Sequence, residues 1–407
     1  MAISSGLMLL ALMLLLALLI KPLAEKYYIP FAGLLVIVGF AGSELLVSIG
    51  IDTGVRYDSF HDLILFVFLP LLIFESAFKI DAAQLGKQLL VILFFAIPVM
   101  LLSTFVAAAM IYYGIAYPDA FPWTAALLTG ALLSATDPVA VIEMMRKLGV
   151  PERLCMLLDG EALLNDATAI VVFGIFLYFA QHPTEDISVL NASLQFLIVF
   201  FGGAISGLFI GLCFLFLSRL LHDYVQQAVI TLIAAYISYL VAGELLGVSG
   251  VMSVLVTGMV LGRVIHHDFQ GHEKRAFVDD FWTFNVYVAE AIMFLLMGVT
   301  ITYDMFIDNW LAMLIGIVAV LIARAVGVFG GGPLISLLPN VERISFNYQK
   351  IMFLGGLRGA VTLALALSLP TTLDYWWTVQ PIAFGVVLFT LFVQAPLIVP
   401  LLKKQGF

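Results

Sequence analysis

Three short polar strings interrupt the long apolar stretches of this chain, and they carry the side chains that could do chemistry. They are ATDPVAV at Ala135–Val141, GEALLND at Gly160–Asp166 and GGLRGAV at Gly355–Val361. Ionisable groups are costly in hydrocarbon, so a membrane segment that keeps them uses them, facing protein or a watered cavity. Carboxylates placed there can bind a proton or a small hard cation, because such cations prefer oxygen ligands.

Asp166 is the carboxylate best suited to bind an ion. We expect no basic partner for it, because only Arg324 and Arg358 are expected within the membrane. Loss of water favours the protonated form of a carboxylate, so Asp166 can hold a proton or a cation but not both. Further oxygen atoms are expected nearby from Thr136, Asp137 and Asn165. Competition of this kind is by itself an exchange mechanism.

Glu161 is expected to do a different job. On a helix, Glu161 and Asp166 point in directions about 140° apart, so they face different neighbours. Residue counts from the inner helix ends place Glu161 and Arg358 at a similar depth, roughly 12 Å from the inner surface. We expect Glu161 to pair with Arg358, with Arg324 or with both, as an ionic strut that is silent in transport.

The elements that must hold these residues are membrane helices. Of the 407 residues, 63% are hydrophobic and 11% are charged, and the mean hydropathy is +1.12, whereas a soluble domain has about 25% charged residues. The apolar runs lack the alternation of a β-barrel. We expect about thirteen spans, most near or above the roughly 20 residues that cross hydrocarbon. The expected spans are 3–20, 30–50, 61–78, 88–114, 121–146, 153–180, 190–217, 226–242, 249–265, 281–301, 309–329, 349–369 and 379–402.

The basic residues predict the orientation. With the N-terminus outside, only Arg56 of the 18 Lys and Arg residues falls in an outer loop, and Arg324 and Arg358 lie within spans. This positive-inside pattern predicts a multi-pass plasma-membrane protein with a cytoplasmic C-terminus. The first apolar stretch lacks a basic segment before it, so we interpret it as a span rather than a signal peptide. The net charge of −9 gives no reason to expect nucleic acid as a partner.

Thirteen spans divide into six, one and six, which would invert the second half relative to the first. The fifth spans of the two halves, 121–146 and 349–369, both contain helix-breaking residues. Pro138 removes a backbone donor and disfavours helical geometry at Asp137, and glycines weaken the helix around Arg358. Half-helix ends would then meet at one depth, where Asp137 and Arg358 can compensate their partial charges.

These strings, together with FLLMG at Phe294–Gly298, resemble those of the NhaP/NHE-type sodium/proton antiporters, in the monovalent cation–proton antiporter family. The resemblance implies an all-α, NhaA/NhaP-like fold in one membrane domain and a homodimer. We expect no cytoplasmic regulatory domain, because only a few residues follow the last expected span. It implies scaffold helices at about 1–80 and 190–301 and transport helices at about 88–180 and 309–404. The activity it implies is exchange of Na+ or Li+ for H+, with no cofactor.

The resemblance also assigns roles to residues. Asp166 is similar to the aspartate that binds both cation and proton. The other matches are Asn165 as its partner, Thr136 and Asp137 as the crossing-helix pair, Glu161 with Arg358 as an internal salt bridge, and Glu75, in LIFESAF, as a third-span acid near the ion site. The implied ligands of the transported Na+ are therefore Asp166, Asp137 and Thr136.

Two positions near Asp166 bear on ion preference and stoichiometry. Ala162 stands where the NhaP pattern has serine, so one hydroxyl ligand is missing, and water can substitute for it. Asn165 precedes Asp166, and relatives with Asn-Asp tend to be electroneutral, whereas those with two aspartates tend to be electrogenic. We expect one cation to exchange for one proton.

Other functions fit the sequence less well. K+/H+ exchange is the closest alternative, and a cation channel is a more distant one, because acids paired with arginines at a helix crossing do not line a continuous pore. An enzyme is not expected, because the spans contain no His–Ser pair, metal-ligand cluster or nucleotide loop. We interpret Glu290 as structural, and Glu143 and Asp159 as charges at helix ends or in a vestibule.

Overall fold

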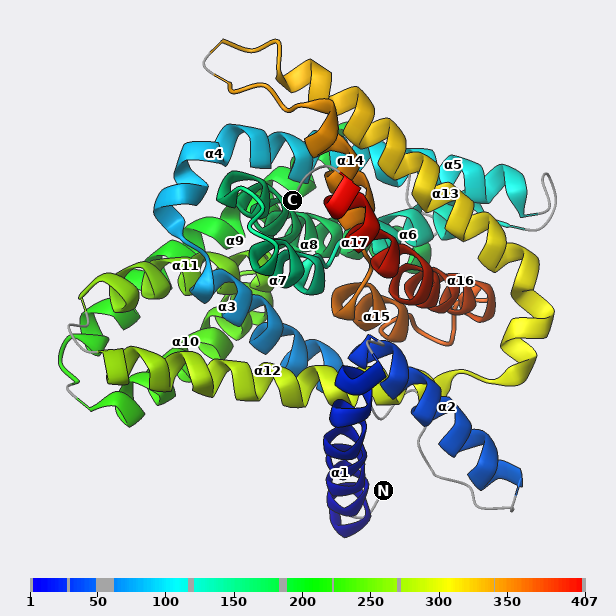
Figure 1. Cartoon of the computed structure of the whole chain (residues 1–407), viewed down its shortest axis with the longest axis horizontal. Helices are drawn as coiled ribbons and strands as arrows, with labels where there is room; N and C mark the ends of the chain where they lie inside the picture. The colour runs from blue at the N-terminus through cyan, green and yellow to red at the C-terminus, as the bar shows by residue number, and fades with distance from the viewer. Residues whose placement is uncertain are drawn as a thin grey trace.

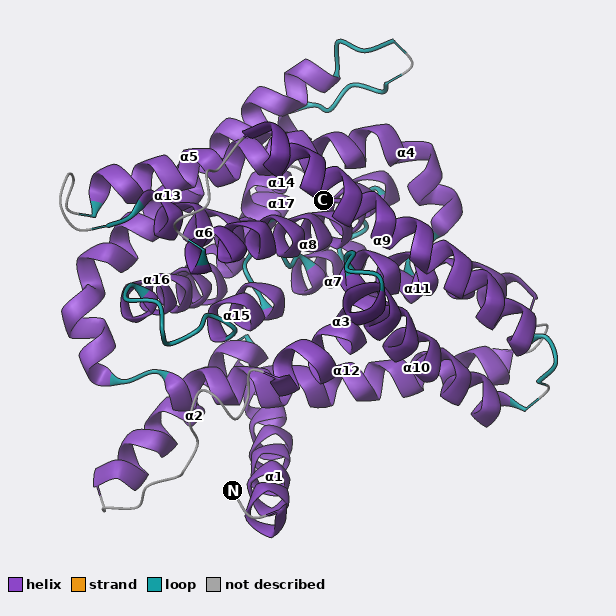
Figure 2. Cartoon of the chain, turned by 180° about the vertical axis from the view of Figure 1, so that it is seen from behind, coloured by secondary structure: helices purple, strands orange, loops and turns teal. Residues whose placement is uncertain are grey.

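The structure is a computed structural model that describes residues 3–27, 30–48, 62–115, 121–182, 189–221, 223–268, 272–339 and 341–404. Every regular element within these ranges is a helix (Figure 2). The α-helices are α1 (Ile3–Tyr27), α2 (Phe31–Ser48), α3 (Leu69–Lys79), α4 (Ala82–Phe94), α5 (Met100–Gly114), α6 (Trp123–Ser134), α7 (Val139–Lys147), α8 (Glu152–Gln181), α9 (Val189–Ser218), α10 (Tyr224–Leu240), α11 (Gly250–Asp268), α12 (His272–Thr300), α13 (Tyr303–Ile335), α14 (Phe346–Gly355), α15 (Ala360–Leu367), α16 (Trp376–Phe389) and α17 (Ala395–Lys404). Short π-helical segments connect some of them: η2 (Leu63–Phe68), η3 (Phe95–Val99), η4 (Val241–Leu245) and η5 (Thr390–Gln394).

The helices fall at the positions expected for membrane spans. Seven continuous helical stretches of the described residues, some of which join α-helices through π-helical segments, are long and apolar enough to cross a membrane. The helices α14 and α15 pass the same test together, as a pair bent by 42°. The shorter apolar helices lie in α1, α2, α6 and α11, and the segment η2–α3 covers the expected third span. The all-helical, polytopic fold is therefore confirmed, although α12 begins at His272, well before the expected start of its span.

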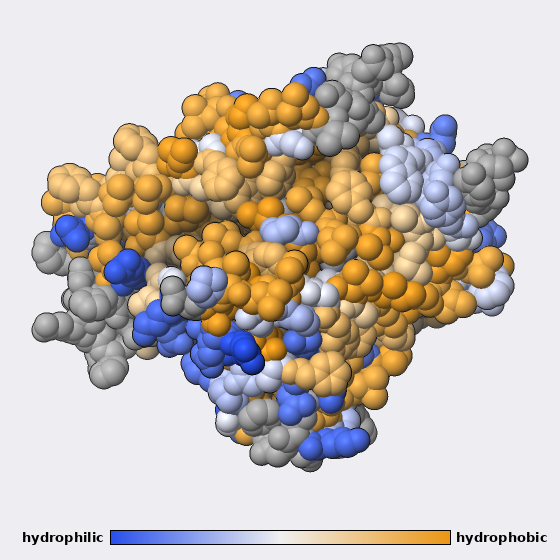
Figure 3. Space-filling view, turned by 90° about the horizontal axis from the view of Figure 1, so that it is seen from above, coloured by the Kyte–Doolittle hydropathy of each residue, from blue (hydrophilic) through white to orange (hydrophobic). Residues whose placement is uncertain are grey.

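The surface of the molecule fits a lipid environment. Apolar residues cover most of the face shown in Figure 3, and polar residues gather toward one edge. Large apolar side chains are exposed along α9 and α13, including Phe209, Phe216 and Trp310. Such a surface is unfavourable in water and favourable in hydrocarbon.

The helices pack in two groups, with α8 running between them (Figure 1). One group contains α1 to α3 and α9 to α12, and the other contains α4 to α7 and α13 to α17. Glycine allows close packing inside the first group: a Cβ at Gly207 of α9 would collide with the main chain of Ser253 in α11, as in other membrane helix pairs. The roles of scaffold and transport domain, and the inverted relation of the two halves, stay predictions.

Asp81, an acid outside the apolar spans, has a structural role. Asp81 precedes α4, and its Oδ1 accepts hydrogen bonds from the backbone N–H groups of Ala83 (2.9 Å) and Gln84 (3.1 Å). These bonds, chiefly the one from Gln84, hold the pKa of the Asp81 carboxyl below its ordinary value. Asp81 is thus an N-cap, which satisfies backbone donors that the first turn of a helix leaves free.

Candidate functional site

Two interrupted helices cross at the centre of the site. As the sequence predicts, one helix is interrupted between α6 and α7 around Pro138, and the other is interrupted between α14 and α15 around Arg358. The backbone N–H of Asp137 donates to the backbone carbonyl of Leu357 at 2.9 Å, which joins the two breaks directly. The expected crossing is therefore present in the structure.

Asp137 lies at the amino end of α15. Its carboxylate interacts with the backbone N–H groups of Val139 and Ala360, which begin α7 and α15. A Cβ on Gly359 would overlap the Asp137 carboxylate, so glycine is needed at this close approach. The negative charge of Asp137 thus faces the partial positive charge of two helix N-termini.

Arg358 donates hydrogen bonds to carbonyl groups at the C-terminal ends of α6 and α14. Its Nε donates to the carbonyl of Leu133 in the last turn of α6, at 2.5 Å, and its Nη1 donates to the carbonyl of Gly356 just after α14. Carbonyls at helix C-termini lack intrahelical partners and carry partial negative charge. The compensating role expected for Arg358 at the crossing agrees with these bonds.

Glu161 forms its ion pair with Arg324 of α13, and not with Arg358. Both Glu161 carboxylate oxygens accept from the Arg324 guanidinium, whose Nη2 also donates to the carbonyl of Met352 at 2.9 Å. Glu161 is 2% exposed. The pairing with Arg358 that the resemblance implies is thus wrong for this structure, because the Arg358 side chain is engaged by helix-end carbonyls, whereas the alternative pairing with Arg324 is present.

Asn165 holds the break of α6 and α7 in place. Its Nδ2 donates to the carbonyl of Ser134, the last residue of α6, at 2.9 Å and to the hydroxyl oxygen of Thr136 at 3.1 Å. Asn165 is 2% exposed and is not among the described residues that line the nearby cavity. The structure therefore places Asn165 behind Thr136, as a residue that positions it.

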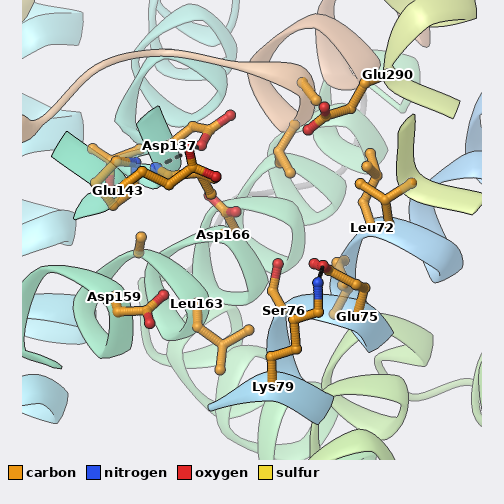
Figure 4. A pocket seen from close by; sticks show the side chains of 18 of the residues that line it. Leu72, Glu75, Ser76, Lys79, Asp137, Glu143, Asp159, Leu163, Asp166 and Glu290 are labelled. Atoms are coloured by element: carbon orange, nitrogen blue, oxygen red, sulfur yellow. Dashed lines mark hydrogen bonds and ion pairs between the residues drawn. The ribbon is translucent and has the colours of Figure 1, made fainter. Parts of the chain in front are cut away.

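A cavity of about 260 Å³ opens beside the crossing (Figure 4). Asp166, Asp137 and Thr136 line it, together with Ala162 and Glu75. Asp166 is largely buried, and its Oδ1 has no hydrogen-bond partner. The structure thus brings together, around one space, the residues expected as ligands of the ion, with an unsatisfied carboxylate oxygen among them.

The cavity wall contains an acid whose place there the sequence analysis missed. Glu290 of α12, interpreted above as structural, lines the cavity, and so do Glu143 of α7 and Asp159 of α8, for which a vestibule was one of the two expected positions. Helical spacing held a signal for Glu290, because Thr283 and Tyr287 precede it by seven and three residues and line the same cavity. Within the described parts of the chain, no three His, Cys, Asp or Glu side chains are close enough to hold a metal ion.

The family of the chain follows from comparison with known proteins. The profile of the family described as "Sodium/hydrogen exchanger, transmembrane" matches residues 11–404. The chain belongs to the sodium/hydrogen exchanger family. This is a family of transporters rather than enzymes, and the exchanger is a multi-pass membrane protein.

Curated relatives of the exchanger cover most of its length. The Na+/H+ antiporter ApNhaP of Aphanothece halophytica is 35% identical over 378 residues, which are 93% of this chain and 70% of the relative. The low-affinity Na+/H+ antiporter NhaS1 of Synechocystis is 36% identical over 382 residues, which are 92% of this chain and 68% of the relative. The resemblance noted from the sequence strings is therefore confirmed.

A solved structure shares the fold of the exchanger. The sodium proton antiporter MjNhaP1 from Methanocaldococcus jannaschii superimposes with a TM-score of 0.84 at 20% identity, over 100% of both chains. At that identity the likeness concerns the fold, which confirms the NhaP-like architecture expected from the sequence.

Proposed function

We propose that the exchanger moves Na+ in one direction and H+ in the other across the membrane, one for one, with both ions competing for Asp166. The observation that carries the proposal is the position of Asp166 beside the crossing, where it borders the cavity and its buried Oδ1 has no hydrogen-bond partner. A desolvated carboxylate oxygen of this kind needs a cation or a proton. The exchange of Na+ for H+ by the relatives ApNhaP and NhaS1 supports the same function.

The ligands follow from the lining of the cavity. Na+ would be held by oxygen atoms of Asp166, Asp137 and Thr136, which are the hard donors that such a cation prefers. Asn165 fixes the position of the Thr136 side chain, because its amide donates a hydrogen bond to the Thr136 hydroxyl oxygen. The Thr136 hydroxyl hydrogen is not used in this bond and can point away from a bound cation. A proton arriving at Asp166 removes the charge that holds Na+, and Na+ arriving there displaces the proton.

Charge balance supports a one-for-one exchange. The Asp166 site is neutral when it holds a proton and neutral when it holds Na+. Asn165 adds no second titratable carboxylate, because a side-chain amide does not ionise; its Nδ2 instead donates to the Ser134 carbonyl. The loaded protein therefore carries the same net charge in both directions of the cycle, and membrane voltage should not drive it.

Alternating access would come from movement of one helix group against the other. In this part of the proposal, α4 to α8 and α13 to α17 carry the ion, and the remaining helices form a scaffold within a homodimer in the plasma membrane. The N-terminus would lie outside and the C-terminus in the cytoplasm. The meeting of the two groups along α8 with α9 and α11, and along α12 with α15, is consistent with such a sliding surface.

Transport by the purified protein in proteoliposomes tests the proposal. An imposed pH gradient should be dissipated by Na+, with saturation, and the rate should be the same at membrane potentials clamped to different values. Asp166→Asn should abolish this activity. Asp159→Asn is the matched control, because it removes an acid of the same helix and cavity that is not a proposed ligand.

Three outcomes would contradict particular parts of the proposal. A rate that follows voltage would refute the one-for-one stoichiometry. Dissipation by K+ but not by Na+ or Li+ would establish the alternative K+/H+ exchange. Robust Na+-driven proton movement by Asp166→Asn would refute the assignment of the ion site.

A further inference from the structure

The cavity contains a cationic side chain of its own. Among its described lining residues, Lys79 of α3 is the one basic side chain, and it shares the wall with several carboxylates. Its ammonium lies 2.5 Å from the Glu75 carboxylate, one turn earlier on the same helix. Figure 4 shows Lys79 reaching up along α3 to meet Glu75. The acid expected near the ion site is therefore already occupied by a positive charge.

The scaffold side of the cavity holds Lys79 in this position. Its Nζ also donates to the hydroxyl oxygen of Thr283 in α12 at 2.9 Å. The Thr283 hydroxyl in turn donates to the carbonyl of Asp279 at 2.8 Å, so its oxygen presents a lone pair to the ammonium. The lysine thus has two acceptors, Glu75 and Thr283, on helices of the same packed group.

The Glu75–Lys79 pair differs from the buried Glu161–Arg324 pair in how easily it can open. The Lys79 side chain is 38% exposed and that of Glu75 is 16% exposed, whereas Arg324 and Glu161 are 9% and 2% exposed. Ion pairs that water reaches are weak, because solvent screens the attraction and can replace either partner. A lysine ammonium is also a compact, mobile charge on a flexible stem, unlike a guanidinium held at several points. Glu75 can therefore change partners while Glu161 cannot.

We propose that Lys79 is a tethered competitor of the transported cation. Its ammonium pairs with Glu75 while the cavity holds no Na+, and when Na+ approaches Asp166 it exchanges Glu75 for water while it keeps its bond to Thr283. The competition sets the apparent Na+ affinity from the cavity side, so Lys79 is a positioning residue that acts through Glu75. This inference rests on the proposed Na+/H+ exchange at Asp166.

Lys79 could instead have a purely structural role, which its position on α3 defines. Lys79 is the last residue of α3, where a positive charge stabilises the helix end. A purely structural lysine would alter thermal stability and leave the Na+ concentration dependence of exchange unchanged. The two roles can therefore be separated by measuring KM and kcat beside the melting temperature.

The test is a double-mutant cycle in proteoliposomes with Na+ as the probe. Lys79→Gln should lower the KM for Na+ by about three- to tenfold, as expected for the loss of one charge near a partly watered site. Lys79→Arg, which keeps the charge, should not lower it. Lys87→Gln is the matched control, because Lys87 is an exposed lysine of α4 that is not part of the cavity wall. In a Glu75→Gln background, Lys79→Gln should lose most of its effect.

Three results would overturn the proposal. One is a KM for Lys79→Gln equal to that of Lys87→Gln. Another is an equal fall in KM with and without Glu75, which would indicate a general charge effect. The third is a lower melting temperature with an unchanged KM, which would assign Lys79 to the helix end. Failure of the exchange mechanism itself is read separately, from activity retained by Asp166→Asn.

Discussion

Asp166 and Glu161 lie on the same helix, but their surroundings make them different groups. Glu161 is sealed among buried residues with both oxygens accepting from Arg324. Asp166 faces a cavity and keeps one oxygen without a partner. The difference arises from the direction in which each side chain leaves α8, because residues five apart on a helix point about 140° away from each other.

The comparison shows what distinguishes a structural acid from the acid that we propose to bind the transported ion. A carboxylate with a permanent charged partner cannot release it without stranding two buried charges. A carboxylate beside water and other acids can exchange a proton for a cation at little structural cost. The same chemical group therefore does either job, and the partner decides which.

The largest expected effect concerns Asp166, the proposed ion-binding acid. Asp166→Asn should abolish Na+/H+ exchange while leaving the melting temperature of the purified protein unchanged or higher, because it removes a desolvated charge whose Oδ1 has no hydrogen-bond partner. Exchange is measured in proteoliposomes and melting by intrinsic fluorescence in detergent. A strongly destabilised Asp166→Asn protein would mean that Asp166 is also part of the framework, and the contrast with Glu161 would disappear.

The next largest effect concerns the strut. Glu161→Gln should destabilise the fold by about 3–5 kcal/mol, because it leaves the buried Arg324 without its counter-charge. Replacing both partners, by Glu161→Gln together with Arg324→Met, should cost less than Glu161→Gln alone. Thermal unfolding of the three variants measures the comparison.

The identity of the partner can be tested in the same series. Double-mutant cycles should show strong coupling between Glu161 and Arg324 and little between Glu161 and Arg358. The reverse pattern would restore the pairing that the family resemblance implies. It would also require Arg358 to leave the carbonyls of Leu133 and Gly356.

A smaller effect concerns the cavity face of α8. Ala162 lines the cavity one turn before Asp166, so Ala162→Ser should add an oxygen that can reach the ion. A gain of about 0.5–1.5 kcal/mol, by analogy with one net hydrogen bond, corresponds to a few-fold lower KM for Na+. Exchange should stay independent of voltage, since serine adds no titratable group. An equal or higher KM in sodium-uptake assays would refute the missing-ligand interpretation.

The smallest effect concerns Asp81, which belongs neither to the Glu161–Arg324 ion pair nor to the proposed ion site. The pKa of Asp81 is lowered in the folded protein by backbone N–H donors, so its contribution to stability is present above the unfolded value of about 3.9. It is lost as the pH falls through the lower, folded value. Asp81→Ala should reduce stability by about 1 kcal/mol or less at pH 7. The difference from the parent should shrink toward pH 3, and a difference that grows there would contradict the capping role.

The sequence predicts those features of the site that are local in the chain. Pro138 and the glycines flanking Arg358 break their helices through their own backbone chemistry, so the residue types alone are enough to predict the crossing. The expectation of no basic partner for Asp166 rests on the shortage of basic residues in the spans. The crossing is present in the structure, whereas the role of Asp166 stays a prediction.

Other features depend on which helix faces come together, and sequence alone does not contain that information. Glu161 could be paired by depth with either Arg324 or Arg358, because depth says nothing of direction around the bundle axis. Glu290 belongs to the cavity wall only because α12 packs against α3 and α15. The bond from Lys79 to Thr283 joins residues 204 positions apart, which no local pattern predicts.

The hydrogen bond from the N–H of Asp137 to the carbonyl of Leu357 has a consequence for genetics. Both partners are peptide groups, and every residue except proline supplies the donor. An alanine scan would not detect this bond, because alanine keeps both backbone groups. Any other substitution at either position also leaves the bond possible, unless proline replaces Asp137. The contact that ties the two broken helices together is therefore inherited as backbone geometry, and slow amide exchange at residue 137 would reveal it where mutagenesis is blind.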